Sequence, residues 1–506
     1  MANLSVSKIF LSACAASVLS GCATHLDDTR KMRGAWETGA YAPAAEAAAE
    51  GAKSAGDTDR LVWLLDEGAA NRAAGNTDAS LKAFDSAFDM VSAFDKAPEV
   101  SIADESRALF TNLSYLPYTG YNYDRIMLGT YQALNGMQKG KIEDAAVMLK
   151  RVEFFQRDAE RKNRDRIEKE MKSVKSNSGG QVDGEKVYDY NKAMQDSGFK
   201  NALKKNYGSV PEANVRGQYV NPFSYWLDGV YFMTCGSDAS DFGRARDSLR
   251  LASGMVNSEY VKQAERLAEL AANNMAVPDM TYVIYEAGSA PVRKQIRIDI
   301  PLGFVTREVP YVGAAFPKLE KNSNYAPTIP VQAGGKTYDT EVIADMDAII
   351  EREFNDELPV VIARTLISTG SKAMAQWGLQ QAARTANNDY VLLATMIAGS
   401  VYQASMNDAD LRTWSTLPKQ IRIAAFLTPS DGFIEVAGSK VALKNAKANF
   451  VLVKRTGANA LTVIQTFALG ERTATPSAQV HPAPTVVVAP AAVISPAAGK
   501  TECKSK

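Results

Sequence analysis

Histidine is nearly absent from this sequence. Only His25 and His481 occur among 506 residues, and both lie in segments whose composition predicts no regular structure. Nucleophilic triads and most protein zinc sites depend on imidazole, so catalysis or metal binding based on histidine is not expected. An excess of positive charge is also missing, because 57 Lys and Arg balance 57 Asp and Glu. A nucleic-acid-binding protein needs a basic surface. We therefore predict no metal, no cofactor and no nucleic-acid partner.

Long apolar runs are missing too. No stretch reaches 18 consecutive apolar residues, whereas a helix that crosses a bilayer needs about 20. The best candidate, residues 391–404, includes Ser400 and Gln403 and is more typical of a buried helix. With 46% hydrophobic and 23% charged residues, the composition is that of a globular chain with roughly two to four domains.

Residues 1–22 have the pattern of a secretory signal. Lys8 precedes an apolar, small-residue run from Ile9 to Leu19, and the segment ends in Leu-Ser-Gly-Cys at Cys22. The run matches the ~7–15-residue apolar part of a signal peptide and is too short to span a membrane. An ordinary signal with an incidental cysteine is the alternative interpretation.

The Leu-Ser-Gly-Cys sequence also resembles the bacterial lipobox. That resemblance implies that residues 1–21 are removed and that Cys22 carries fatty acyl groups such as palmitate. Three acyl chains, at ~0.8 kcal/mol per buried CH₂, hold a protein in a bilayer effectively permanently. Ala23 follows Cys22. In enteric-type sorting, a residue other than Asp at this position resembles the pattern of lipoproteins that are exported to the outer membrane. Of the other cysteines, Cys235 is predicted to be free and buried, and Cys503 lies near the C-terminus.

The front half of the mature chain predicts paired helices. We expect a lipidated tether and first helix over 22–52, followed by a helical repeat domain over 53–275. Residues 61–87, 131–152 and 225–252 each resemble a tetratricopeptide (TPR) unit, with small residues where paired helices touch and a turn between them. Three imperfect copies are enough to bury a continuous core, although a plain helical domain with chance matches is the alternative.

In the first unit, Gly68 is the small residue that lets the paired helices approach closely. Phe84 is the side chain that fills the groove between them. Gly75 marks the turn, and Gly229 and Leu249 stand at corresponding positions of the third unit. Between units two and three, residues 157–207 predict a charged helical arm that folds back after Gly179 and Gly180. This arm is interpreted either as a binding arm or as a solvated, ion-paired face.

The back half, residues 278–470, predicts an α+β domain with a small, mostly antiparallel sheet. Alternating apolar residues predict a strand over 296–300. Further strands are expected at 281–285, 325–338, 420–426, 432–437, 449–454 and 462–467, with a hairpin turn at 429–432. Helices are expected at 341–354, 358–386 and 389–406, the last two as an apolar hairpin. The Pro- and Ala-rich tail, residues 471–506, predicts disorder.

Motifs that carry chemistry are weak. Residues 334–337 (GGKT) lack the first glycine of a phosphate-binding loop and favour a polar turn. Asp347 and Glu351 would share a helical face, which is more often an exposed surface than an acid–base pair. In the segment DLRTWSTLP, Arg412 and Trp414 favour a structural corner that includes a pair between Arg412 and Asp410. No catalytic residue is assigned, and the protein is not expected to be an enzyme.

Together, the lipobox, the helical repeats and the segments TYVIYEAGSAPVRKQIRIDIPL, VGAAFPKL and DLRTWSTLPKQIRIAAF resemble uncharacterised conserved bacterial outer-membrane lipoproteins with a TPR-like front half. This resemblance implies an envelope location and no reaction. The leading hypothesis is a periplasm-facing scaffold or assembly factor for envelope proteins of unknown identity. The alternatives are a cell-wall-acting enzyme or sugar-binding module that uses carboxylates of the back half, and a structural lipoprotein that oligomerises through residues 358–406.

Substitution of Cys22→Ala tests the anchor. We expect the variant to incorporate no labelled fatty acid and to leave the membrane fraction, because acyl transfer requires the thiol. Metabolic labelling with a palmitate analogue, followed by membrane fractionation, measures both effects. A variant that stays membrane-bound beside a wild-type protein that takes up no label would contradict the lipoprotein assignment.

Overall fold

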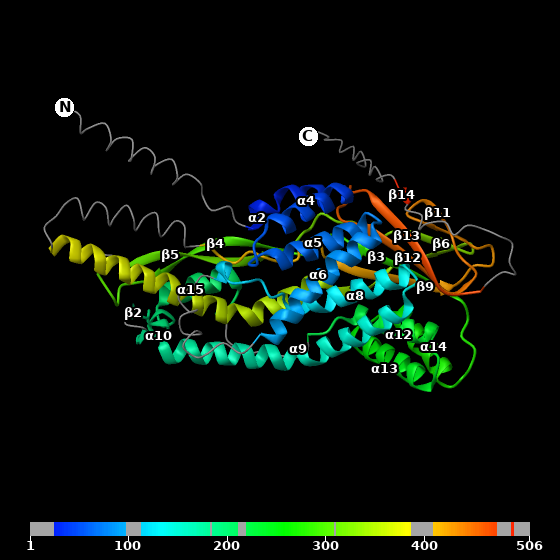
Figure 1. Ribbon diagram of the computed structural model, residues 1–506, viewed down its shortest axis with the longest axis horizontal. Helices are drawn as coiled ribbons and strands as arrows, with labels where there is room; N and C mark the ends of the chain where they lie inside the picture. The colour runs from blue at the N-terminus through cyan, green and yellow to red at the C-terminus, as the bar shows by residue number, and fades with distance from the viewer. Residues whose placement is uncertain are drawn as a thin grey trace, which may run out of the picture.

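The computed structural model describes residues 25–97, 113–182, 185–210, 219–307, 310–385, 408–472 and 487–489. Helices fill the front half and sheets lie in the back half, so the predicted α+β class is confirmed at that level (Figure 1). The helices are α2 (His25–Asp28), α3 (Arg30–Glu37), α4 (Tyr41–Ser54), α5 (Arg60–Ala73), α6 (Thr77–Lys96), the 3₁₀ turn η1 (Leu113–Tyr115), α8 (Asn122–Gln138), α9 (Ile142–Asn177), α10 (Tyr190–Ala193), α11 (Ser197–Tyr207), α12 (Pro222–Cys235), α13 (Ala239–Met255), α14 (Glu259–Ala272) and α15 (Met346–Thr385). The strands are β1 (Gln181–Val182), β2 (Glu185–Lys186), β3 (Met280–Ala287), β4 (Val292–Pro301), β5 (Tyr311–Glu320), β6 (Val331–Ala333), β7 (Lys336–Tyr338), β8 (Glu341–Asp345), β9 (Gln420–Leu427), β10 (Phe433–Val436), β11 (Ser439–Ala442), β12 (Ala446–Arg455), β13 (Thr462–Glu471) and β14 (Val487–Ala489).

The three predicted helical units are observed as the helix pairs α5–α6, α8–α9 and α12–α13. Gly75 and Gly140, which lie in the first two turns, have φ values of +82° and +72°, a region that glycine enters without strain. The paired helices approach closely at glycines. A Cβ atom at Gly68 would lie 2.3 Å from the ring of Phe84, and one at Gly229 would lie 2.4 Å from Cγ of Leu249. The contacts expected within the first and third units are therefore confirmed.

The six-stranded sheet has the order β14-β13-β12-β3-β9-β8, and only its β12–β3 pair is parallel. Both of its faces are buried, because alternate residues of each strand point in opposite directions. On β3, Tyr282 and Ile284 belong to the core beneath the helices, whereas Val283 and Tyr285 belong to the core shared with a second sheet. That second sheet is antiparallel, with the order β11-β10-β6-β7. The small sheet, the large sheet and the helices of the front half are thus stacked in three layers.

A buried ion triad joins the helices to the large sheet. Glu286 of β3 accepts from Arg72 Nη1 of α5 at 2.9 Å and from Lys454 Nζ of β12 at 2.7 Å. The three side chains are only 4–7% exposed. The guanidinium of Arg72 lies 4.6 Å from the ring centroid of Tyr131, and Lys454 Nζ lies 4.5 Å from that of Trp36. Both cations therefore have an anion and an aromatic face as partners in place of water.

The long helix α15 lies beside the β4–β5 hairpin, and α9 lies along α15 on the side away from the hairpin (Figure 1). Both helices extend beyond the six-stranded sheet (Figure 1). Residues 157–177 are not a separate arm, because they continue α9. One face of α9 is buried along its whole length at spacings of three and four residues: Ala145, Leu149, Val152, Gln156, Ala159, Asn163, Ile167, Met171 and Val174. Its last turns pack against Val360, Ala363 and Ile367 of α15. The predicted solvated face is therefore confirmed only for the opposite side of this helix.

Two expectations for the ends of the chain need correction. The chain is folded from the first described residue, His25, which lies in α2, so a tether does not extend into this region. Trp36 of α3 is 1% exposed because it packs edge-on against Tyr41 and beneath Lys454. In the tail, Val487–Ala489 form β14 and pair with β13, because an open sheet edge offers backbone hydrogen-bond partners.

Four local expectations are wrong for reasons of tertiary packing. Residues 341–345 form β8 instead of helix, because they complete the edge of the sheet at β9. The helices expected at 341–354 and 358–386 are one helix, α15, which continues through Pro359. Residues 429–432 join β9 to β10 of the other sheet and do not form a hairpin turn. Residues 185–194 contain β2 and the short α10 in place of a helical arm. The second helix of the apolar hairpin, 389–406, lies outside the described residues.

The ion triad predicts a large effect of Glu286→Gln. We expect a loss of about 3–5 kcal/mol in the free energy of unfolding, because two cations stay buried without their anion. Urea denaturation measures the loss. Glu435→Gln, an exposed site on β10, is the matched control and should change stability by less than about 0.5 kcal/mol. Equal stabilities of the two variants would show that the triad does not join the layers.

Candidate functional site

A cleft of about 660 Å³ lies between α9, α15 and the segment 113–121 that leads into α8. Its apolar lining is Phe94, Leu113, Leu116, Pro117, Tyr118, Tyr121, Val360 and Val361. Its basic lining is Arg125, Lys162, Arg166, Lys169, Arg364 and Arg412. Its acidic lining is Glu170, Glu353, Glu357 and Asp410. The cleft thus combines apolar walls with more basic than acidic side chains.

Buried polar groups hold the segment 113–121 in place. The hydroxyl of Tyr118 donates to the carboxylate of Asp124, and Asp124 Oδ2 also accepts from the backbone N–H of Tyr121 at 2.9 Å. The N–H of Tyr118 donates to the carbonyl of Thr58 at 2.8 Å, which links the segment to the start of α5. Burial raises the pKa of Asp124 to about 6, although these hydrogen bonds oppose the shift.

Arg412 fixes the same segment from the other side. Its guanidinium forms two hydrogen bonds with Asp410, at 2.8 and 2.9 Å. It also donates to the carbonyls of Leu113 and Leu116 at 2.8 and 2.7 Å, and to Asp59 at 3.1 Å. The predicted structural corner and its Asp410–Arg412 pair are confirmed. That Arg412 also joins segments about 300 residues apart could not be predicted from the sequence around it.

Trp414, the other predicted member of the corner, is fully buried. Its ring lies edge-on to Phe84 and Tyr131, with centroids 5.9 and 5.8 Å apart, and its Nε1 donates to Thr416 at 2.9 Å. Thr416 in turn donates through both its N–H and its hydroxyl to Asp66. Burial raises the pKa of Asp66 to about 7. This corner therefore attaches the strand region to α5, α6 and α8.

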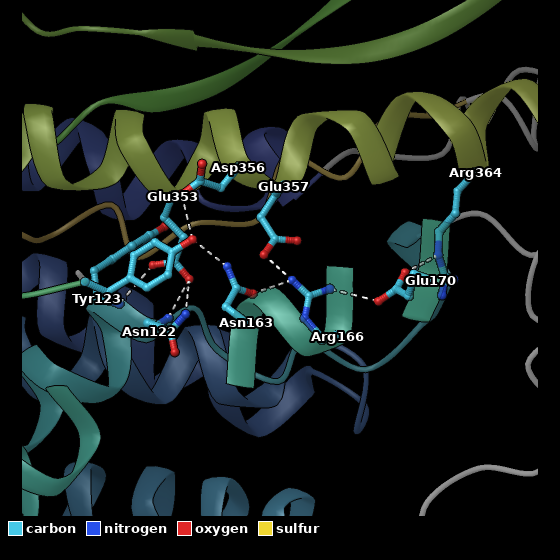
Figure 2. A network of polar contacts seen from close by, with 10 residues as sticks. Asn122, Tyr123, Asn163, Arg166, Glu170, Glu353, Asp356, Glu357 and Arg364 are labelled. Carbon is cyan, nitrogen blue, oxygen red and sulfur yellow. Dashed lines mark hydrogen bonds and ion pairs between the residues drawn. The ribbon is translucent and has the colours of Figure 1, made fainter. Parts of the chain in front are cut away.

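Glu353 of α15 lies at the N-terminus of α8, as Figure 2 shows. Its Oε1 accepts from the backbone and side-chain N–H groups of Asn122, both at 2.8 Å, and its Oε2 accepts from the N–H of Tyr123 at 3.2 Å. The first N–H groups of a helix lack partners within the helix, and the helix dipole favours a negative charge there. Burial nevertheless raises the pKa of Glu353 to about 8. This side chain acts as a cap supplied by a distant part of the chain.

A second set of polar contacts joins α9 to α15 (Figure 2). Arg166 donates to Glu357 of α15, and to Asn163 and Glu170 of α9 at 2.7 and 2.8 Å. Glu170 also accepts from Nε of Arg364 at 2.8 Å. The residues involved are three or four positions apart on α9 and seven apart on α15, so they lie on one face of each helix and fix the register between the two.

Tyr219 extends the same network toward α12. Its hydroxyl accepts from Asn163 Nδ2 at 2.7 Å and donates to Asp356 Oδ2 at 2.6 Å. Asn221, the N-cap of α12, donates its backbone N–H to Gln156 of α9 at 2.6 Å. The polar residues Gln156 and Asn163 on the buried face of α9 therefore both bind the segment that leads into α12.

The chemistry of the cleft favours binding over proton transfer. Its acidic side chains are acceptors for groups of the protein: Glu353 for a helix N-terminus, Glu357 and Glu170 for Arg166, and Asp410 for Arg412. By contrast, Nη1 of Arg364 is buried without a hydrogen-bond partner in the part of the chain that the structure describes. A buried unpaired N–H is costly, and an acceptor from a ligand would relieve that cost.

The two carboxylates that the sequence places on one helical face, Asp347 and Glu351, lie outside the cleft. Asp347 is buried and pairs with Lys419, whereas Glu351 is partly exposed and pairs with Lys321 at 2.7 Å. Glu353 was one of several acidic residues in this region, and only its contact with α8 distinguishes it. The lipidation residue Cys22 lies outside the described residues. Cys235 is half-buried and free, and burial raises the pKa of its thiol to about 11.

Gly334 and Gly335 form the turn of the β6–β7 hairpin, with φ values of +54° and +74°, which confirms the predicted polar turn. Among the residues that the structure describes, no group of three or more His, Cys, Asp or Glu is placed to hold a metal ion. The described helices include none that is long and apolar enough to cross a membrane.

Comparison with known proteins identifies no relative. No family model matches the chain, and no curated protein or solved structure matches it significantly.

Glu353→Gln should change how stability depends on pH. The pKa of Glu353 is raised from 4.5 to about 8, so the folded state keeps a proton that the unfolded chain loses. Its contribution is fully present below pH 4.5 and falls by up to about 1.4 kcal/mol per pH unit as the pH rises toward 8. We expect the variant to lack this decline in urea titrations at several pH values. Glu351→Gln, at a partly exposed site on the same helix, should keep the decline. A variant with the wild-type pH profile would contradict the assignment.

Proposed function

We propose that this protein is an outer-membrane lipoprotein that faces the periplasm and acts as a scaffold or assembly factor for another envelope protein. The lipobox at Cys22 supports the location, together with the preceding signal-like segment. The cleft between α9 and α15 supports the binding role, because its acids are committed to structural partners while Arg364 keeps a buried N–H available.

We further propose that the helical half is built, like TPR proteins, from stacked pairs of antiparallel helices. Close helix–helix contacts at Gly68, Gly129 and Gly229 support this idea, since a Cβ at each would lie within 2.6 Å of a side chain on the next helix. Stacked helix pairs of this kind present concave surfaces to peptides and helices. The long extension of α9 beyond its partner α8 departs from a regular array.

The partner segment that fits the cleft carries carboxylates beside apolar residues. Basic lining residues outnumber acidic ones by six to four, and the walls near Tyr118 and Val360 are apolar. A bound carboxylate would accept from Arg364 and complete its hydrogen bonding. An acidic, partly apolar stretch of an envelope protein has this chemistry.

The competing proposal is an enzyme or sugar-binding module that acts on the cell wall. One observation favours it: Glu353 and Glu357, one helical turn apart on α15, line the same cleft. The third proposal, oligomerisation through residues 358–406, needs an apolar face on α15. Leu358, Ile362 and Leu366 of that helix instead pack against the β4–β5 hairpin within the same chain.

A photocrosslinking amino acid at Lys162 tests the scaffold proposal in intact envelopes. Lys162 lines the cleft and its side chain is 57% exposed, whereas Asp247 on α13 is 62% exposed and lies outside the cleft. We expect a discrete adduct from position 162 and none from 247. Arg364→Gln should reduce the adduct about 10-fold or more, since charged hydrogen bonds contribute ~1.5–3 kcal/mol, and Arg364→Lys should restore part of it.

Two outcomes would contradict this proposal. Adducts of equal yield from both positions would mean that the cleft is not the binding surface. Turnover of a cell-wall fragment by the purified protein, abolished by Glu357→Gln, would establish the enzyme instead.

A further inference from the structure

The folded body begins very close to the proposed lipid anchor. Only Ala23 and Thr24 separate Cys22 from His25, the first residue of α2. A fully extended chain covers at most ~3.3–3.6 Å per residue, so this link reaches no more than about 11 Å. The anchor therefore has almost no tether of its own.

The start of α2 is also fixed to the rest of the molecule. Leu26 packs against Ala315 of β5 and against Ala409 and Leu411 of the segment before β9. The ring of His25 lies edge-on to that of Trp63, with centroids 5.5 Å apart. Because these contacts come from several distant parts of the chain, α2 cannot swing away from the body without breaking them.

The first turn of helix adds hydrogen bonds to these contacts. Arg33 Nη2 donates to the carbonyl of Leu26 at 2.8 Å, and the hydroxyl of Thr29 donates to the carbonyl of His25 at 2.8 Å. The short link and the rigid attachment together restrict how the protein lies on a membrane.

We infer that the bilayer headgroups lie against the surface formed by α2, α3 and the end of α4, and that the protein has one fixed orientation on the membrane. This inference rests on the proposed acylation of Cys22. A hollow of about 510 Å³ next to α2, lined in part by Asp28, Lys31 and Ser54, belongs to this surface. Lys31 pairs with Glu50 at 3.2 Å and Arg30 pairs with Asp27, so the surface carries charges of both signs and can approach zwitterionic headgroups without net repulsion.

The orientation decides which surfaces a partner can reach. In Figure 1, α9, α13 and α14 lie on the opposite side of the molecule from α2 and α4. With α2 at the bilayer, these helices face the aqueous compartment. The charged outer face of α9 is then accessible to soluble and membrane-bound partners alike.

Site-specific quenching tests this inference in the acylated, full-length mature protein. A fluorophore is attached to Lys31→Cys or, as the matched control, to Asp247→Cys, each with Cys235 and Cys503 replaced by Ser. The protein is inserted into phosphatidylcholine vesicles that contain a headgroup spin-labelled lipid. We expect quenching at position 31 to be at least threefold stronger than at position 247.

A spacer provides the decisive comparison. Ten Gly and Ser residues inserted between Thr24 and His25 lengthen the link by roughly 17 Å on average. The spacer lies outside every described helix, so the body should fold unchanged, and quenching at position 31 should fall to the value at position 247. Equal quenching at the two positions without the spacer, in protein that mass spectrometry shows to be acylated, would overturn the fixed orientation alone. Absence of acyl groups on Cys22 would overturn the lipoprotein proposal and this inference with it.

Discussion

The buried triad of Arg72, Glu286 and Lys454 is the contact on which the arrangement of the layers depends. Charges removed from water are tolerated only when partners stand at fixed positions, and here the partners come from α5, β3 and β12. Apolar contacts alone would allow helices to slide over a sheet, whereas this geometry admits one placement. The rings of Tyr131 and Trp36 lie against the two cations, which also ties α8 and α3 to that placement.

The same principle recurs around the cleft. Asp66, Asp124 and Glu353 are buried carboxylates that accept hydrogen bonds from backbone N–H groups. The donors to Asp66 and Glu353 lie in segments distant in sequence, whereas Asp124 accepts from Tyr121, just before its own helix. Desolvation makes a buried carboxylate costly unless hydrogen bonds compensate for the lost water, so each carboxylate helps to hold its donor segment in place. The walls of the cleft are therefore formed before any ligand arrives. Preformed walls suit recognition of a partner, because less ordering is required at the moment of binding.

The proposed anchor at Cys22 would lie close to a rigid body, and this closeness would restrict how the protein meets a partner. A long tether would let the body sample many orientations, whereas a link of a few residues confines both the position and the direction of the binding surface. Association then becomes a search along a surface, and the affinity of each contact can be modest. On this proposal, the signal-like N-terminus supplies the anchor and the contacts of α2 hold the body close to it. The exposed outer face of α9 is then presented to partners.

Local patterns in the sequence determined the elements whose signals are themselves local. Glycine turns and small-residue contacts located the helix pairs at Gly75 and Gly68, and the sequence of DLRTW located the Asp410–Arg412 pair. Alternation located β4, and short runs rich in apolar residues located β3, β9 and β12. Only the tertiary structure decided the rest. Residues 341–345 became strand because β9 offered a free edge, and α15 continued through Pro359 because it is packed against both α9 and the β4–β5 hairpin. Glu353 became a cap for a helix more than 200 residues away. Such partners are chosen by desolvation and by where the folded chain brings them, and no window of neighbouring residues contains that information.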